Sequence, residues 1–119
     1  MPRFSTSILA VIVGLTGQQA QAQGVLQEAL LETLRAIAEG DCPDHLMSPM
    51  LRGMCLQQMP AFGETIRQRG EVESAEFMGV QPTPNGSVEV YNVTFPSSEM
   101  MWMINTLPDG KVYVFWSPG

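Results

Sequence analysis

The stretch Ser87–Ser117, SVEVYNVTFPSSEMMWMINTLPDGKVYVFWS, determines the fold class of this chain. It contains three runs in which apolar and polar residues alternate, separated by Pro-Ser-Ser and Pro-Asp-Gly. Such runs between turn residues predict antiparallel strands joined by hairpins, here at residues 87–95, 99–107 and 111–117. A fourth strand is predicted before them, at residues 71–81. The second separator fits a type I turn with a G1 bulge, with Gly110 in the left-handed region.

The hairpins also predict a register. If Ser97-Ser98 is a two-residue loop, Phe95 lies opposite Met100; if residues 108–110 form a three-residue loop, Trp102 lies opposite Trp116. One face then has no polar member and must be covered by helices. Its expected members are Tyr91, Val93, Phe95, Met100, Trp102, Ile104, Val112, Val114 and Trp116. A slip of one residue would move the side chains of the affected strand to the other face.

The opposite face is mixed but still rich in apolar side chains. It is expected to carry Val90, Asn92, Thr94, Met101, Met103, Asn105, Tyr113 and Phe115. Large apolar patches are uncommon on monomers, and aromatic residues and methionine are enriched at interfaces. We therefore expect a surface for a homodimer, an envelope-protein partner or a small apolar ligand, formed by Phe77, Met101, Met103, Tyr113 and Phe115. The alternative is that loops of the chain itself cover these side chains.

Three helices are predicted before the strands. Residues 25–39 have leucine and isoleucine at helical spacing and end at Gly40. Ser48-Pro49 is a typical N-cap and first helical residue for a second helix, up to about residue 58. Pro60 should open a short third helix that ends at Gly70. The expected fold is α+β, with three N-terminal helices packed on a curved four-stranded antiparallel sheet.

Residues 1–22 are predicted to be a cleaved signal peptide. Arg3 supplies a positive charge, Ile8–Leu15 is an apolar run, and Ala20-Gln21-Ala22 is a cleavage site. The apolar run is too short to cross a bilayer as a helix, and the alternative is a buried N-terminal helix. We expect a single domain at residues 23–119, periplasmic or secreted, with no membrane anchor after cleavage. The net charge of −6 disfavours binding to nucleic acid and to anionic membranes.

Four segments carry a family resemblance. They are Ser74–Val80 (SAEFMGV), Val90–Phe95 (VYNVTF), Met101–Ile104 (MWMI) and Leu107–Val112 (LPDGKV). This half of the chain resembles the small nuclear-transport-factor-like (cystatin-like, SnoaL-like) cone domains, above all the short exported bacterial ones of unknown function. The resemblance implies a curved sheet wrapped against helices, a pocket at the open end of the cone and, in many members, dimers formed through the sheet. Catalytic members use buried Asp and His.

This chain departs from the catalytic pattern of that family. No Asp lies in the predicted strands, and the only histidine, His45, lies outside them. We therefore expect a non-enzymatic interaction domain without a cofactor. A small pocket enzyme, of the isomerase or hydratase type, is an alternative that needs a buried carboxylate or His45 facing a cavity.

Cys42 and Cys55 are the only cysteines, and an exported protein meets an oxidising environment. They are thirteen residues apart, which corresponds to about 20 Å along a continuous helix. A disulfide needs Cα atoms within roughly 7 Å, so the chain must turn between them, and Ser48-Pro49 allows such a turn. We predict a structural disulfide. A redox pair is the alternative, but the C-x-x-C spacing is absent.

A second alternative function is periplasmic Cu(I) binding. Thioether and imidazole groups are suitable Cu(I) ligands, and the segment offers His45, Met47, Met50 and Met54. Methionine at helical spacing also fills irregular gaps in a core, which is the competing interpretation.

Overall fold

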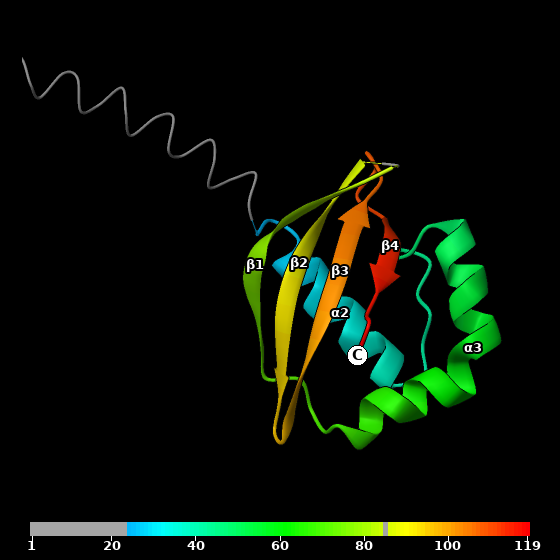
Figure 1. Cartoon of the computed structure of the whole chain (residues 1–119). Helices are drawn as coiled ribbons and strands as arrows, with labels where there is room; N and C mark the ends of the chain where they lie inside the picture. Colours follow the sequence, from blue (N-terminus) through cyan, green and yellow to red (C-terminus); the bar gives the residue numbers. More distant parts are fainter. Residues whose placement is uncertain (1–23, 85) are drawn as a thin grey trace, which may run out of the picture.

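The computed structural model describes residues 24–84 and 86–119, and it has two helices and four strands there. The elements are α2 (Gln27–Ala38), α3 (Pro49–Gln68), β1 (Ser74–Thr83), β2 (Gly86–Phe95), β3 (Ser98–Thr106) and β4 (Val112–Trp116). The strands form one antiparallel sheet in the order β1-β2-β3-β4 (Figure 1). The predicted α+β class and four-stranded meander are confirmed. The predicted signal peptide lies outside the described residues.

The prediction of three helices is wrong, because α3 continues through Pro60. Its start is as predicted: the Leu51 amide donates to the Ser48 hydroxyl at 3.3 Å, and Pro49 is the first helical residue. A proline inside a helix removes one hydrogen bond and crowds the carbonyl four residues earlier, so the helix bends or breaks. Pro60 is exposed, and Figure 1 shows α3 bent near its middle. The strain at Pro60 therefore bends one long helix rather than dividing it.

The core lies between α2 and one face of the sheet. Leu30, Leu34 and Ile37 are almost fully buried on α2, at the spacing that the sequence predicted. The sheet contributes Tyr91, Val93, Phe95, Met100, Trp102 and Ile104, all of them buried. Burying one such large side chain stabilises the fold by about 1.5–3 kcal/mol. This is the apolar face that the alternation in β2 and β3 predicted.

The register between β2 and β3 differs from the prediction by two residues. Tyr91 pairs with Trp102 and Val93 with Met100, so the hairpin loop is Pro96-Ser97. Side chains in a strand alternate with a period of two. A two-residue shift therefore leaves every side chain of β2 and β3 on its predicted face.

The register between β3 and β4 contains a β-bulge, and here the predicted face is wrong. Thr106 pairs with Val112 as the turn predicts, but Asn105 then pairs with Val114 and Ile104 with Phe115. The extra residue is Tyr113. Beyond the bulge each side chain points to the face opposite to the predicted one. Val114 and Trp116 therefore leave the core face, and Phe115 joins it.

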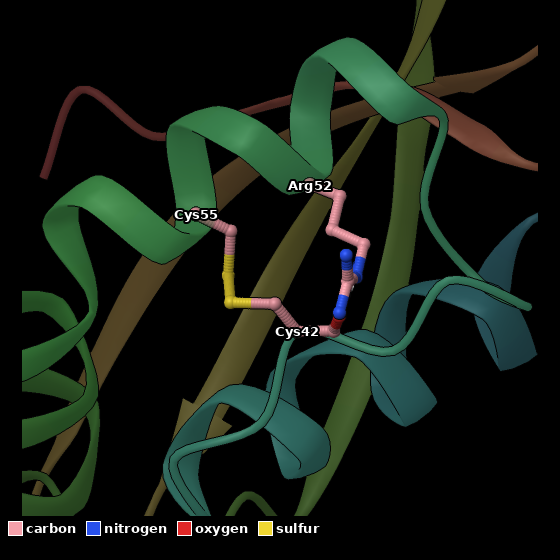
Figure 2. The surroundings of a disulfide bond; sticks show 3 residues. All are labelled: Cys42, Arg52 and Cys55. Carbon is pink, nitrogen blue, oxygen red and sulfur yellow. Dashed lines mark hydrogen bonds between the residues drawn. A yellow bond between two sulfur atoms is a disulfide. The ribbon is translucent and has the colours of Figure 1, made fainter.

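The predicted disulfide between Cys42 and Cys55 is confirmed, with 6.1 Å between the Cα atoms (Figure 2). Cys42 lies in the loop after α2, and Cys55 lies in the first half of α3. The Arg52 side chain also donates from Nε to the Cys42 carbonyl at 2.7 Å. Two further bonds tie the end of this loop to β4: the Ser48 amide donates to the Val112 carbonyl, and the Val112 amide donates to the Leu46 carbonyl, both at 2.8 Å.

Removal of the disulfide should destabilise the fold without changing it. Replacing Cys42 and Cys55 by serine is expected to lower the free energy of unfolding by about 3 kcal/mol, because the unfolded chain regains the entropy of an open loop. Urea denaturation followed by circular dichroism measures the loss, and reduction of the wild-type protein should give the same value. A change below about 0.5 kcal/mol, the range of ordinary surface substitutions, would contradict this role.

Candidate functional site

The face of the sheet that points away from α2, called the outer face below, is the first candidate site. No helix of residues 24–84 and 86–119 covers it, and Figure 1 views the sheet from this side. The pairings place Val90, Met103 and Trp116 next to one another across β2, β3 and β4. Trp116 is 55% exposed, whereas Val90 is 9% exposed although it lies outside the core cluster. Val90 is therefore covered by neighbouring side chains of the outer face and not by a helix.

Only part of the predicted interface lies on the outer face. Met101 and Met103 are there, and the Tyr113 hydroxyl accepts a hydrogen bond from Asn105, which is on the same side. The two phenylalanines point toward the helices instead. Phe77 pairs with Tyr91, with 5.7 Å between their ring centroids, and the Phe115 ring stacks on the Trp102 ring with centroids 4.4 Å apart.

Val114 and Trp116 were missed because the bulge in β4 exchanged the faces. Phe77 was misplaced for another reason, since no pairing between β1 and β2 was derived from the sequence. Gly110, with its positive φ, correctly indicated the loop at residues 108–110. Nothing in the sequence indicated the β-bulge at Tyr113.

A cavity of about 220 Å³ between α3 and the β3–β4 side of the sheet is the second candidate site. Its inner wall contains Met47, Phe62, Met100, Trp102 and Phe115. No charged side chain lines it, and the polar side chains are those of Gln58 and Ser117. The cavity can therefore hold an apolar group but has nothing that neutralises a charge.

The four predicted copper ligands are not gathered at one point. Met47 and Met54 both line the cavity, whereas Met50 is 78% exposed and neither Met50 nor His45 contributes to its wall. In the described part of the chain, no three His, Cys, Asp or Glu residues are grouped as a metal site would require. Of the four predicted ligands, two therefore line the same cavity and two lie outside it.

Sequence reasoning missed a buried carboxylate, Glu89, which is 7% exposed. Its oxygens accept hydrogen bonds from the Gly24 amide at 3.1 Å, the Leu26 amide at 3.2 Å and the Tyr91 hydroxyl at 2.6 Å. Leu26 is the N-cap of α2, so the negative charge lies at the positive end of the helix dipole. The alternation along β2 did carry a signal, because Glu89 stands two residues before Tyr91 on the core face.

The surroundings of Glu89 indicate a structural role. A hollow of about 310 Å³ lies beside it, so the buried carboxylate required for a pocket enzyme exists. However, two backbone amides and one hydroxyl already bind its oxygens. A general base must be able to reach a substrate proton. This carboxylate instead joins the start of α2 to β2.

Comparisons of the chain with protein-family models, with curated proteins and with solved structures find no match. Across residues 24–84 and 86–119, no helix has the length and apolar character to span a membrane. The Cys42–Cys55 disulfide is compatible with an oxidising compartment outside the cytoplasm.

The Glu89–Tyr91 pair predicts a loss of stability in alkaline solution. Burial, and then the hydrogen bond and charge of Glu89, raise the pKa of Tyr91 above its ordinary value of 10.0. Since the raised pKa belongs to the folded state, this stability is fully present below about pH 10. It is lost as the pH rises above that value, by up to ~1.4 kcal/mol per pH unit. Urea denaturation between pH 7 and 11 measures it.

The variant Tyr91→Phe should lack this alkaline decline and should be less stable at pH 7 by about 1.5–3 kcal/mol, because Glu89 loses a donor. Tyr113→Phe is the control, since Tyr113 is the only other tyrosine and is half-buried on the outer face. It should keep the decline. An equal decline in the wild-type protein and in Tyr91→Phe would show that Tyr91 is not its source.

Proposed function

We propose that this chain is an exported, non-enzymatic interaction domain of the nuclear-transport-factor-like cone type, and that it acts as a homodimer joined through the outer face. The observation that carries the proposal is the apolar band formed by Val90, Met103 and Trp116 across three strands. An envelope protein bound to the same face is the alternative that the experiment below separates from self-association.

The composition of the outer face supports an interface. Val88, Met101 and Val114 lie on the same face beside the band, where Met101 is opposite Asn92 and Val114 is opposite Asn105. Contiguous apolar patches of this kind are uncommon on monomers, and Met and aromatic residues are enriched at interface cores. The acidic residues of this face, Glu76 and Glu99, lie toward the β2–β3 hairpin end and leave the middle uncharged. The face thus has an apolar centre with charge at its border.

The distribution of charge selects one arrangement of two copies. A dimer with two-fold symmetry uses the same patch twice. In one such arrangement, β3 lies antiparallel over β3 of the second copy, and the two-fold axis passes through Met103. Glu99 of one copy then faces position 107 of the other. The Leu107 amide donates to the Lys111 carbonyl at 2.9 Å, so Lys111 lies beside that position. A two-fold axis parallel to the strands would instead place Glu76 and Glu99 of one copy over the same residues of the second copy. Repulsion between these carboxylates disfavours that arrangement, the more so in a chain with a net charge of −6.

Two further observations support export and binding. The predicted signal sequence and the disulfide both agree with a protein that works outside the cytoplasm. The buried carboxylate of Glu89 is occupied by donors of its own chain, which favours a structural role over catalysis.

Met103→Asp should convert the dimer into a monomer, because a charge would be buried without a partner at the axis. The dissociation constant should rise by roughly 30-fold or more. Size-exclusion chromatography with light scattering, over a range of protein concentrations, measures the change. Met50→Asp is the matched control: Met50 is an exposed methionine on α3, away from the sheet, and this variant should remain dimeric.

An exchange of charges tests the arrangement itself. Glu99→Lys and Lys111→Glu should each weaken the dimer by roughly two- to five-fold, and the double variant should restore it. If the single variants weaken the dimer and the double variant does not restore it, the antiparallel arrangement is wrong. If the wild-type protein is a monomer at every concentration, the homodimer is wrong and the envelope-protein alternative takes its place.

A further inference from the structure

The start of the described chain is anchored to the sheet beside Glu89. The amides of Gly24 and Leu26 donate to the two oxygens of this carboxylate, at 3.1 and 3.2 Å. Gly24 has a positive φ of 74°, and a Cβ added to it would touch the Phe77 side chain at 3.5 Å. The backbone therefore meets the carboxylate at Gly24, the first residue that the structure describes.

Glu89 is a buried acidic group that has donors but no cation. It is 7% exposed, and its three donors, two amides and the Tyr91 hydroxyl, are all neutral. In the described part of the chain the one ion pair joins Arg67 to Glu64, so no basic side chain pairs with Glu89. A carboxylate that loses its hydration on burial is compensated best by hydrogen bonds together with an opposite charge. The folded domain supplies the first of these and not the second.

Cleavage of the predicted signal peptide would create a cation next to this carboxylate. Ala20-Gln21-Ala22 predicts cleavage before Gln23, so the new α-ammonium group belongs to the residue that precedes Gly24. Three covalent bonds join the nitrogen atoms of consecutive residues, which keeps these atoms within about 4 Å of each other. Since the Gly24 nitrogen is 3.1 Å from Glu89 Oε2, the ammonium group stays within about 7 Å of the carboxylate. In the precursor the same nitrogen belongs to a neutral amide.

We propose that the α-ammonium group created by cleavage after Ala22 is the counter-ion of Glu89, and that it stabilises the processed domain relative to its precursor. The inference rests on the proposed export, because export removes residues 1–22. Solvent screens a charge pair less beside a buried group than at an open surface. The Cys42–Cys55 disulfide likewise forms in an oxidising compartment. Both restraints are thus added after the chain leaves the cytoplasm, where the domain is proposed to act.

The charge of the amine can be removed without moving the amine. Lys111 is the only lysine, so in Lys111→Arg the α-amine is the only primary amine of the processed chain. Gln23→Ser is added because an N-terminal glutamine can cyclise, with loss of ammonia and of the charge. The exported double variant is then acetylated, which removes the positive charge, or reductively dimethylated, which keeps it. The two products differ only at the N-terminus.

Acetylation should raise the unfolding equilibrium constant about five-fold relative to dimethylation, at about pH 6.5, where an α-amine is protonated. Urea denaturation of both products at one protein concentration measures this ratio. The difference should vanish in Glu89→Gln, which keeps the size of the side chain and loses its charge. It should also vanish when Ser-Gly-Ser is inserted after residue 23, because the amine then lies farther from the carboxylate. The insertion leaves the core unchanged and serves as the control if Glu89→Gln does not fold.

The N-terminus of the wild-type protein separates failure of the inference from failure of the proposed export. Intact mass spectrometry of the exported protein should show a chain that begins at Gln23 with a free amine. If residues 1–22 remain attached, the export proposal and the inference are both wrong. The inference alone is wrong if the processed N-terminus is cyclised, or if the two products unfold with equilibrium constants within about two-fold, as for an exposed ion pair. A difference that persists in Glu89→Gln or after the insertion would also overturn it, because the ammonium group would then act on another part of the domain.

Discussion

The extra residue in β4 determines which aromatic side chains enter the core and which remain outside. Tyr113 is an extra residue after the pair formed by Thr106 and Val112. The side chains that follow it therefore point to the opposite faces of the sheet from those that regular pairing would give. Phe115 therefore stacks on Trp102 and forms part of the cavity wall. Trp116 is carried to the outer face, where it completes the apolar band. The bulge therefore decides which aromatic side chain each face of the sheet receives from the end of β4.

The second constraint is the loop between α2 and α3. It is attached to α3 by the Cys42–Cys55 disulfide and by Arg52, and to the start of β4 by backbone hydrogen bonds. These attachments position the first half of α3 beside the edge strand β4. The bend at Pro60 directs the second half of α3 toward the end of α2, where the Arg67 side chain donates a hydrogen bond to the Ala38 carbonyl. A domain of this size buries little core, so such covalent and local restraints have a large effect on its stability.

The sequence allowed most of the fold to be predicted, because local chemistry determines it. Helical spacing in α2, the Ser48-Pro49 start of α3 and the alternation in β2 and β3 each depend on neighbouring residues, and the structure agrees with all of them. The continuous α3 could not be predicted, because a proline disfavours a helix locally and only tertiary packing decides whether the helix bends or ends. The bulge could not be predicted either, because a one-residue irregularity leaves the hydrophobic pattern of β4 almost unchanged. The disulfide needed only a turn between two cysteines, whereas the pairing of Glu89 with the start of α2 joins residues 63 and 65 positions apart.

Two buried polar groups on adjacent strands differ in how far their hydrogen bonds are satisfied. Glu89 carries a charge, and a buried charge is tolerated only when donors surround it. Its chain supplies three, two of them from the backbone at the start of α2, so the carboxylate joins that helix to β2. The indole of Trp102 is neutral, so its single missing hydrogen bond is a smaller penalty that a folded protein can carry. The paired carboxylate therefore stabilises the fold, whereas the unpaired indole nitrogen, which the core encloses, destabilises it slightly.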